Sequence, residues 1–266
     1  MKRMIAMLVA LLAITGAARG DVMKMAVTTS FHNSGLAEVL LPEIAKDLDL
    51  EVQLLVVGTG QAIKLGEAGD VDAILVHSKA AEEKFLAGGH GTHRREIMFN
   101  DFVFIGPDTD PAGIATAKSA ADALSAVNDA SADFVSRGDD SGTHKKERAL
   151  WSAAGFDIAA LGPWYKEVGQ GMGAALNTAA GMGAYIMADR ASWLNFGNKT
   201  GMALLYSGDP VLFNQYAFLP VNPAKHGHVK NDAAMALEAW LVSDRAKGLI
   251  NGYLLNGEQL FHFNAE

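Results

Sequence analysis

The stretch Phe134–Trp151, F-V-S-R-G-D-D-S-G-T-H-K-K-E-R-A-L-W, decides the fold of this chain. Its first two residues predict the end of a buried strand, and the residues from Glu147 onward belong to a helix that Gly155 can end. The turn between them is rich in Gly, Asp and Ser. Asp140 or Ser141 is suited to cap the helix, because a short side-chain oxygen accepts one of its first free N–H groups. The stretch therefore predicts a strand, a turn and a helix.

The start of this helix also has the composition of an anion site. A helix N-terminus combines free N–H groups with the positive end of the helix dipole. Ser141 and Thr143 add hydroxyl donors, and Arg137 adds a permanent positive charge. Gly142 leaves the backbone open to close approach by a ligand. An ordinary capped helix with a surface arginine uses the same residue types, so this turn alone supports both interpretations.

The first twenty residues predict a cleavable signal peptide. Two basic residues precede the apolar run Met4–Ile14, and small residues follow it. This layout is typical of a secretory signal and is too short for a stable membrane anchor. We expect residues 1–20 to be removed, with cleavage between Ala18 and Asp21, and the mature protein to reside in the periplasm.

The composition narrows the functions that the chain can have. It contains no cysteine, so it has no disulfide, no thiolate metal site and no lipid-bearing N-terminal cysteine. No later run is long and apolar enough to span a bilayer, so we expect no membrane insertion. With 266 residues, 50% of them hydrophobic, the chain suits one large or two small domains.

The charge balance is acidic. Cleavage of the signal peptide removes three basic residues and no acidic one, which changes the formal charge from −8 to −11. The sequence has no basic run, so nucleic acid and anionic membrane surfaces are not expected partners. An acidic protein that binds an anion must use local dipoles and one or two well-placed cations, and the turn at Arg137 meets that requirement.

Strands and helices alternate at short intervals in the first hundred residues. This order predicts an α/β fold with a parallel sheet. We expect strands at Val22–Val27, Glu51–Val57 and Val71–Val76, and helices at Gly35–Lys46 (capped by Asn33 or Ser34), Gln61–Ala68 and Lys79–Leu86.

Residues that carry hydroxyl groups or exposed backbone follow each of these strands. They are Thr28, Thr29 and Ser30, then Gly58-Thr59-Gly60, then His77-Ser78, and the Arg137–Thr143 turn is a fourth such junction. In α/β sheets ligands bind outside the carboxyl ends of the strands. Four junctions of one chemical type predict a shared anion site, although turns in general are rich in Ser, Thr and Gly.

The second half of the chain continues the α/β pattern. We expect a strand at Phe102–Ile105, an Ala-rich helix over Asp110–Asp129 and a helix over Ala174–Ala180. Asp189 is expected to cap a helix that runs to Phe196. The motif G-Q-G-M-G at residues 169–173 lacks the glycine spacing of a dinucleotide site, and we interpret it as a close-packed turn.

Catalytic and metal sites have weak support. The histidine pairs His90/His93 and His226/His228 have no acidic residues at ligand spacing, so we interpret them as exposed loop residues. Ser30, His144 and Asp139 contain the chemistry of a catalytic triad, but the sequence has no Gly-x-Ser-x-Gly elbow. We therefore expect no enzyme, no catalytic residue, no metal and no cofactor.

Motifs spread from Val27 to Arg190 resemble one known family. The chain is similar to the TupA-type, tungstate-binding periplasmic components of ABC importers, which belong to the type II solute-binding superfamily. The segments that carry the resemblance are V-T-T-S-F-H-N-S-G-L, V-G-T-G, G-D-V-D-A-I-L-V-H, F-N-D-F-V-F-I-G-P-D-T-D-P-A, S-R-G-D-D-S-G-T-H-K-K-E-R-A-L-W, G-Q-G-M-G and A-Y-I-M-A-D-R.

The resemblance implies two lobes, each a mixed sheet flanked by helices, joined by a two-segment hinge. Residues 21–105 and 215–266 would form the first lobe, and residues 106–214 the second. Tungstate or molybdate would bind between them, to Thr28, Thr29, Ser30 and Thr59 from one lobe and to Arg137, Ser141 and Thr143 from the other. The partners implied are the oxyanion and an ABC transporter permease in the inner membrane, and we expect a monomer.

The protonation of the ligand leaves one alternative open. A site made only of donors accepts a fully deprotonated dianion, whereas phosphate carries a proton near neutral pH and needs an acceptor. If the carboxylate of Asp139 faces the ligand, a phosphate-binding protein of the same superfamily is expected. If it caps backbone N–H groups, tungstate is expected. The alternative from another class is a secreted serine hydrolase that uses Ser30 or Ser141.

Overall fold

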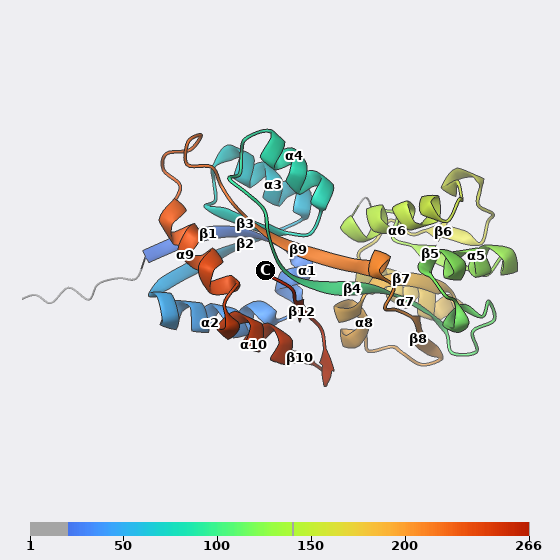
Figure 1. Ribbon diagram of the computed structural model, residues 1–266. Helices are drawn as coiled ribbons and strands as arrows, with labels where there is room; N and C mark the ends of the chain where they lie inside the picture. Colours follow the sequence, from blue (N-terminus) through green and yellow to red (C-terminus); the bar gives the residue numbers. More distant parts are fainter. Residues whose placement is uncertain (1–20, 140, 266) are drawn as a thin grey trace, which may run out of the picture.

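The computed structural model describes residues 21–139 and 141–265. The predicted signal peptide and Asp140 lie outside the described residues. Two groups of helices and strands lie side by side and are joined by the long strands β4 (Arg95–Pro107) and β9 (Phe213–Pro220) (Figure 1). The chain passes from one group to the other along these two strands.

The first group contains three parallel strands and the helices around them. The strands are β1 (Asp21–Thr28), β2 (Leu50–Val57) and β3 (Ala73–Val76). The helices are α1 (Thr29–Asn33), α2 (Leu36–Leu48), α3 (Thr59–Ala68), α4 (Lys79–Ala87), α9 (Asn231–Leu241) and α10 (Asp244–Gly252). The short strands β10 (Leu254–Leu255), β11 (Glu258–Gln259) and β12 (His262–Phe263) follow α10.

The second group is built around the stretch Phe134–Trp151. Its strands are β5 (Phe134–Ser136), β6 (Tyr165–Glu167), β7 (Tyr185–Asp189) and β8 (Met202–Tyr206). Its helices are α5 (Ala120–Ala130), α6 (Gly142–Ala153), α7 (Met172–Met182) and α8 (Arg190–Asn195), with 3₁₀ turns at Ile114–Thr116, Ile158–Ala160 and Pro210–Leu212.

One mixed sheet runs through both groups in the order β2-β1-β3-β9-β4-β7-β5-β6. Strand β1 pairs parallel with β2 and β3, and β5 pairs parallel with β6 and β7. Between these parallel sets, β9 and β4 pair antiparallel with each other and with their neighbours β3 and β7. The α/β fold with a mixed sheet flanked by helices is confirmed, and so is the parallel pairing expected for the first three strands.

Alternating side chains of β1 face two hydrophobic clusters. Met25 and Val27 pack in a cluster with α2, α9 and α10, and Ala26 packs in a cluster with α3 and β3. This arrangement follows from the two-residue period of a strand. A third cluster fills the second group, where the fully buried Trp151 meets Phe134 edge to face at a centroid distance of 5.3 Å. The two ends of the stretch that predicts the fold thus pack on each other.

Strand β4 has 13 residues, although the sequence predicts only Phe102–Ile105. Its first half carries Arg95, Glu96 and Asn100, which do not form a continuous apolar run. Backbone pairing with β9 extends the strand there, with Asn100 directly opposite Asn214. The prediction missed this half because the pairing joins residues far apart in the sequence.

Two helix boundaries differ from the prediction. In the region Asp110–Asp129 the α-helix begins only at Ala120, after a 3₁₀ turn at Ile114–Thr116. Asp110 adopts a positive φ of 42°, and its carboxylate accepts hydrogen bonds from the backbone N–H groups of Ile114 and Ala115. Ser119 caps α5 instead. Helix α2 begins after Gly35 in the left-handed conformation, because a short helix, α1, occupies residues 29–33. Of the two expected caps, Ser34 accepts at its Oγ a hydrogen bond of 3.4 Å from the N–H group of Leu36, the first residue of α2.

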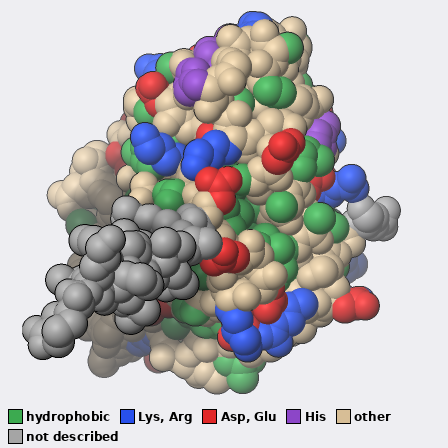
Figure 2. Space-filling view, turned by 90° about the vertical axis from the view of Figure 1, so that its left-hand side faces the viewer, with side chains coloured by type: hydrophobic (Ala, Val, Ile, Leu, Met, Phe, Trp, Pro, Cys, Tyr) green, Lys and Arg blue, Asp and Glu red, His purple; other side chains and the backbone are tan. Residues whose placement is uncertain are grey.

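The surface mixes charges of both signs. Figure 2 views the end of the molecule at which β1, α2 and α9 lie, and basic and acidic side chains alternate on it without a continuous basic patch. Within residues 21–139 and 141–265, no helix combines the length and apolar character needed to cross a bilayer.

Candidate functional site

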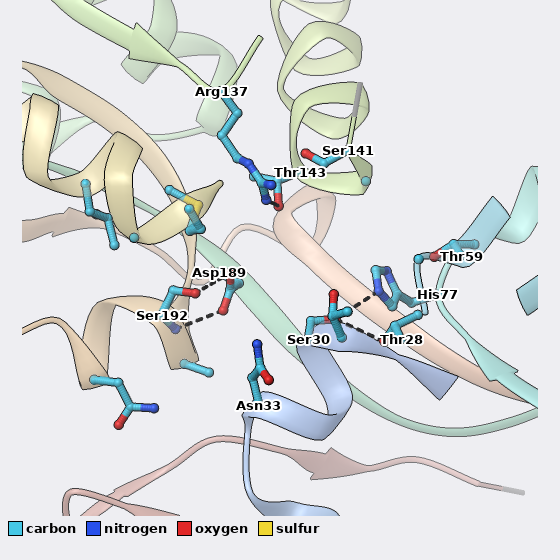
Figure 3. A pocket seen from close by; sticks show the side chains of 18 of the residues that line it. Thr28, Ser30, Asn33, Thr59, His77, Arg137, Ser141, Thr143, Asp189 and Ser192 are labelled. Atoms are coloured by element: carbon cyan, nitrogen blue, oxygen red, sulfur yellow. Dashed lines mark hydrogen bonds between the residues drawn. The ribbon is translucent and has the colours of Figure 1, made fainter. Parts of the chain in front are cut away.

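A cavity of about 770 Å³ lies between the two groups of elements. The structure brings together all seven residues that the sequence predicts to bind the oxyanion, because each of them lines this cavity. They are Thr28, Thr29, Ser30, Thr59, Arg137, Ser141 and Thr143. Figure 3 shows Thr28, Ser30, Thr59 and His77 on one side of the cavity and Arg137, Ser141 and Thr143 on the other.

The first wall is formed by the residues that follow β1 and β2. Thr28 ends β1 and caps α1, since its Oγ1 accepts a hydrogen bond of 3.3 Å from the N–H group of Phe31. Ser30 lies in the first turn of α1. Thr59 begins α3 after Gly58, which provides no side-chain cap. The first N–H groups of α1 and α3 are therefore near the cavity, together with three hydroxyl groups.

The second wall is formed by the start of α6. Ser141 caps this helix as predicted, because its Oγ accepts a hydrogen bond of 3.2 Å from the N–H group of His144. Gly138 has a φ of +61°, and a Cβ atom there would lie 2.8 Å from the Cβ of Glu167, so only glycine fits this turn. The turn aims both Arg137 and the helix N-terminus at the cavity.

Arg137 retains donors for a ligand. Its Nη2 forms an ion pair with Asp139, and its Nη1 lies 3.5 Å from the Oγ1 of Thr143. Its buried Nε has no hydrogen-bond partner among the described residues. Because a guanidinium carries five N–H donors, these contacts leave several of them unused. Figure 3 shows the guanidinium reaching from the end of β5 into the cavity, beside Thr143.

The carboxylate of Asp139 is bonded within the turn before α6. Its Oδ1 accepts a hydrogen bond of 3.2 Å from the Ser141 N–H group, and it does not line the cavity. Burial by itself would raise the pKa of Asp139, but hydrogen bonds from Ser141 and the charge of Arg137 outweigh burial and hold that pKa below its usual value. The sequence left open whether the carboxylate of Asp139 faces the ligand or accepts from backbone N–H groups. The second arrangement is observed, and it is the one expected for a fully deprotonated ligand.

His77 is a site residue that the sequence treats only as part of a turn. Its Nε2 lies 3.1 Å from the Oγ of Ser30, and its ring packs on Tyr216 at a centroid distance of 4.8 Å. Burial lowers the pKa of His77 to about 4, so the imidazole is neutral at neutral pH. Across the cavity, a Cβ atom on Gly142 would lie 3.6 Å from its Cε1, so the two walls meet here.

The motif at residues 169–173 supplies a further helix N-terminus, and its interpretation as a close-packed turn is wrong. A Cβ atom on Gly171 or Gly173 would meet no atom within 4 Å. Gly171 caps α7 without a side-chain hydrogen bond, and Met172 and Gly173 line the cavity. The absence of side chains leaves the first N–H groups of α7 accessible.

The start of α8 completes the site. Asp189 caps this helix, as predicted, and its two carboxylate oxygens each accept a hydrogen bond of 2.9 Å from Ser192, one from the backbone N–H and one from the hydroxyl. Both residues line the cavity (Figure 3). The sequence prediction found the cap but gave no sign that it lies at the site, since Asp189 is brought there by the pairing of β7 with β4.

Five helix N-termini therefore converge on one cavity, those of α1, α3, α6, α7 and α8. The starts of α1, α3, α6 and α7 contribute partial positive charge and N–H groups without a partner within their helices, whereas at α8 the carboxylate of Asp189 accepts from the Ser192 N–H group. Their convergence explains how a chain with a negative net charge can provide a locally positive site.

The described residues form neither the catalytic triad considered from the sequence nor a cluster of metal ligands. Ser30 contacts His77, not His144, whose Nε2 lies 3.2 Å from the carboxylate of Glu167. Asp139 bonds to Arg137 and Ser141, so the triad considered from the sequence is not assembled. Among the described residues, no group of three or more His, Cys, Asp or Glu side chains could hold a metal ion.

Comparisons with known proteins agree with this geometry. The model of the PBP superfamily domain matches residues 15–245. The tungstate-binding protein TupA of Peptoclostridium acidaminophilum is 42% identical over 95% of this chain and 94% of its own length, and that of Campylobacter jejuni is 33% identical over 89% of each. The solved structure of TupA from Desulfovibrio alaskensis G20 is 43% identical and covers 92% of this chain and 100% of its own, with a TM-score of 0.89.

The fold, the convergent helix N-termini and the extent of these matches lead to one assignment. The matches span both groups of elements and the strands that join them, so they are not confined to one motif. The chain belongs to the PBP superfamily and, within it, to the TupA family of binding proteins.

Proposed function

We propose that this protein is the substrate-binding component of an ABC importer and captures a tetrahedral oxyanion in the cavity between its two groups of elements. The ligand is tungstate, with molybdate as a second ligand. The observation that carries the proposal is the convergence of five helix N-termini and Arg137 on one cavity. The names of the relatives, tungstate-binding proteins from two organisms, support the choice of anion.

The donor set favours a dianion without protons. Thr28, Thr29, Ser30, Thr59, Ser141 and Thr143 offer hydroxyl groups, and Arg137 offers N–H groups and charge. Among the described residues that line the cavity, Asp189 alone carries a carboxylate, and Ser192 donates to both of its oxygens. We expect a cavity with many donors and a single carboxylate, itself bonded to Ser192, to favour an unprotonated dianion over monoprotonated phosphate.

The two groups of elements act as lobes in this proposal. Lobe one comprises residues 21–105 and 215–266, and lobe two comprises residues 106–214. Both boundaries fall within the paired strands β4 and β9, which are then the two segments of a hinge. Closure around the ligand would bring Arg137 and the start of α6 against the hydroxyls of Thr28, Thr29 and Ser30 and complete the donor shell.

The site of action follows from the same proposal. A signal peptide at residues 1–20 would direct the protein to the periplasm, where it acts as an unanchored monomer. The closed form would then deliver the anion to a permease in the inner membrane. The protein catalyses no reaction and needs no cofactor or metal for this task.

Calorimetric titration of the mature protein with tungstate, molybdate, sulfate and phosphate tests the proposal. We expect one tight site for tungstate, competition by molybdate, and no heat from phosphate at neutral pH. Binding of phosphate in place of tungstate would make the protein a phosphate receptor. Turnover of ester or phosphoester substrates that is lost in either Ser30→Ala or Ser141→Ala would instead favour a hydrolase.

A further inference from the structure

A buried phenol hydroxyl contacts one of the predicted anion-binding residues. The Oη of Tyr216, on β9, lies 3.0 Å from the Oγ of Ser30. Ser30 lines the cavity, whereas Tyr216 is fully buried and does not line it. Tyr216 can therefore act on a ligand only through the hydroxyl of Ser30.

The ring of Tyr216 is held by three other rings. It meets Phe261 edge to face at a centroid distance of 5.7 Å and packs at 4.8 Å from the ring of His77. Phe31, the residue after Ser30, contributes a third contact at 6.3 Å. Because these contacts restrain the ring, its hydroxyl keeps a fixed place beside the start of α1.

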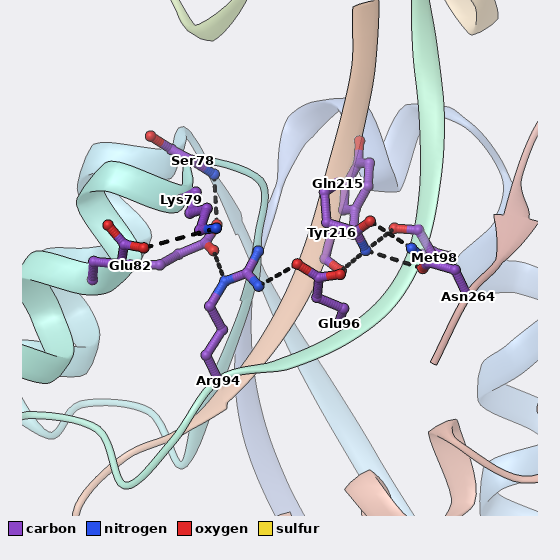
Figure 4. Close-up of polar contacts among 10 residues, drawn as sticks. Ser78, Lys79, Glu82, Arg94, Glu96, Met98, Gln215, Tyr216 and Asn264 are labelled. Carbon is purple, nitrogen blue, oxygen red and sulfur yellow. Dashed lines mark hydrogen bonds and ion pairs between the residues drawn. The ribbon is translucent and has the colours of Figure 1, made fainter. Parts of the chain in front are cut away.

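The backbone that carries Tyr216 is fixed as well. The Nε2 of Gln215 lies 3.1 Å from the backbone oxygen of Tyr216 and 3.0 Å from that of Met98 on β4. The side-chain amides of Gln215 and Asn264 also bond to each other, with distances of 2.7 and 3.1 Å (Figure 4). These contacts join β9 at Tyr216 to β4 and to the segment after β12.

The hydrogen bond between the two hydroxyls has a preferred direction. A phenol O–H group is more acidic than an aliphatic one, and its oxygen is the weaker acceptor, so Tyr216 donates and Ser30 accepts. Burial raises the pKa of Tyr216 to about 12, so the phenol keeps this proton at neutral pH. One lone pair of the Ser30 oxygen is thereby occupied.

The remaining neighbours of Ser30 show why this direction matters. A serine hydroxyl carries one proton and two lone pairs. The Oγ1 of Thr28 lies 3.0 Å from the Oγ of Ser30, and the Nε2 of His77 lies 3.1 Å from it. When Tyr216 and one of these neighbours donate, both lone pairs are used, and the proton of Ser30 is free for an oxyanion. Without Tyr216, the hydroxyl can donate to a neighbour and turn a lone pair toward the anion, which is repulsive.

We propose that Tyr216 is a positioning residue for oxyanion capture: its hydroxyl directs the proton of Ser30 into the cavity. The inference rests on the proposed oxyanion function and adds to it a residue that does not touch the ligand. Tyr216 thus presets one donor of the first wall before the anion arrives, which lowers the cost of ordering the site.

A double-mutant cycle tests the proposal. Tyr216→Phe removes the hydroxyl and keeps the ring, and tungstate affinity is measured calorimetrically with Ser30 present and in Ser30→Ala. We expect about tenfold weaker binding with Ser30 present, the value of roughly one hydrogen bond, and no further loss in Ser30→Ala.

The cycle separates positioning from a structural role. If Tyr216→Phe merely displaced the start of α1, it would also disturb Thr28 and Thr29, which remain in Ser30→Ala. The loss of affinity would then persist in that background. An equal loss in both backgrounds, or a loss in neither, would overturn the inference.

Tyr185 provides the matched control. It is a second buried tyrosine, 1% exposed, and it does not line the cavity. Its Oη donates a hydrogen bond of 2.9 Å to Asp110 and accepts one of 2.8 Å from the N–H group of Ala112. Tyr185→Phe therefore removes a bonded phenol hydroxyl far from Ser30 in the hydrogen-bond network, and its tungstate affinity should stay within about twofold of wild type. A tenfold loss here would attribute the effect to lost stability and contradict the inference.

Failure of the inference is distinct from failure of the proposed function. If the wild-type protein gives no heat with tungstate, the oxyanion proposal fails, and the role of Tyr216 fails with it. If the wild type binds and Arg137→Ala does not, the function stands, and the cycle alone then decides whether Tyr216 positions Ser30.

Discussion

The carboxylate of Asp139 accepts a hydrogen bond of 3.2 Å from the backbone N–H group of Ser141, the residue that caps the helix α6 at the cavity. The same carboxylate pairs with Arg137. Asp139 is therefore occupied by protein donors and does not line the cavity. Asp139 therefore offers no acceptor to a ligand in the cavity, and this favours an unprotonated dianion such as tungstate over phosphate.

Asp139→Asn tests this assignment. The amide oxygen can still accept from Ser141, but the negative charge beside Arg137 is gone. We expect tungstate to bind as tightly as in wild type or severalfold more tightly, because Arg137 is less neutralised, and phosphate to remain without effect. Titration calorimetry with both anions measures this. Loss of phosphate binding on this substitution would show that Asp139 faces the ligand after all.

Arg137→Ala is expected to weaken tungstate binding about 100-fold, which corresponds to roughly 3 kcal/mol. Arg137→Lys should recover only part of this, because an ammonium keeps the charge but loses the planar set of donors. Arg148→Ala is the matched control, since this exposed arginine on α6 does not line the cavity. If Arg137→Ala and Arg148→Ala bind tungstate with equal affinity, Arg137 does not contact the ligand.

Asp189 sets a limit on how strongly the cavity attracts anions. Its carboxylate lines the cavity while it caps α8 through Ser192, and asparagine can replace it as a helix cap. We expect Asp189→Asn to bind tungstate and sulfate severalfold more tightly, because one negative charge leaves the cavity wall. The gain should shrink as salt is added.

Asp122→Asn controls for the change in net charge, because Asp122 is an exposed residue of α5 that does not line the cavity. Its oxyanion affinities should match those of wild type. Weaker binding by Asp189→Asn would mean that the carboxylate orders the start of α8 for the ligand, and that this role outweighs its charge.

Glu147 links stability to pH. It is buried on α6, where the Oη of Tyr165 donates a hydrogen bond of 2.7 Å to its Oε1. Burial raises the pKa of Glu147 from 4.5 to about 7. The folded protein therefore holds this proton over a range in which the unfolded chain has lost it. The contribution of protonated Glu147 to the free energy of unfolding is fully present below pH 4.5 and is lost as the pH rises through 7.

Glu147→Gln keeps an acceptor for Tyr165 and removes the ionisation. Relative to wild type, the variant should gain up to about 3 kcal/mol in unfolding free energy between pH 4.5 and pH 8. Urea denaturation at both pH values measures the gain. The exposed Glu83 on α4 gives the control Glu83→Gln, which should show no such trend. A constant difference between Glu147→Gln and wild type across this range would contradict the buried ionisation.

Local chemistry allowed much of the site to be predicted. The sequence predicted the caps at Ser141 and Asp189 because both side chains bond to groups three residues further on. Such contacts are encoded in short stretches. The same holds for the hydroxyl-bearing residues that follow β1 and β2. All seven predicted residues line one cavity, and their role as ligands remains a prediction.

What the sequence could not supply are contacts between distant segments. Strand register and the packing of distant elements decide the length of β4, the contact of His77 with Ser30, and the arrival of α7 and α8 at the cavity. They also decide the pairing of Asn100 with Asn214 across 114 positions. No local pattern of residues encodes a register between strands so far apart. The sequence by itself determined the kind of chemistry at each strand end. The tertiary structure decided which of these ends meet, because an anion site made of helix N-termini exists only where several helices converge.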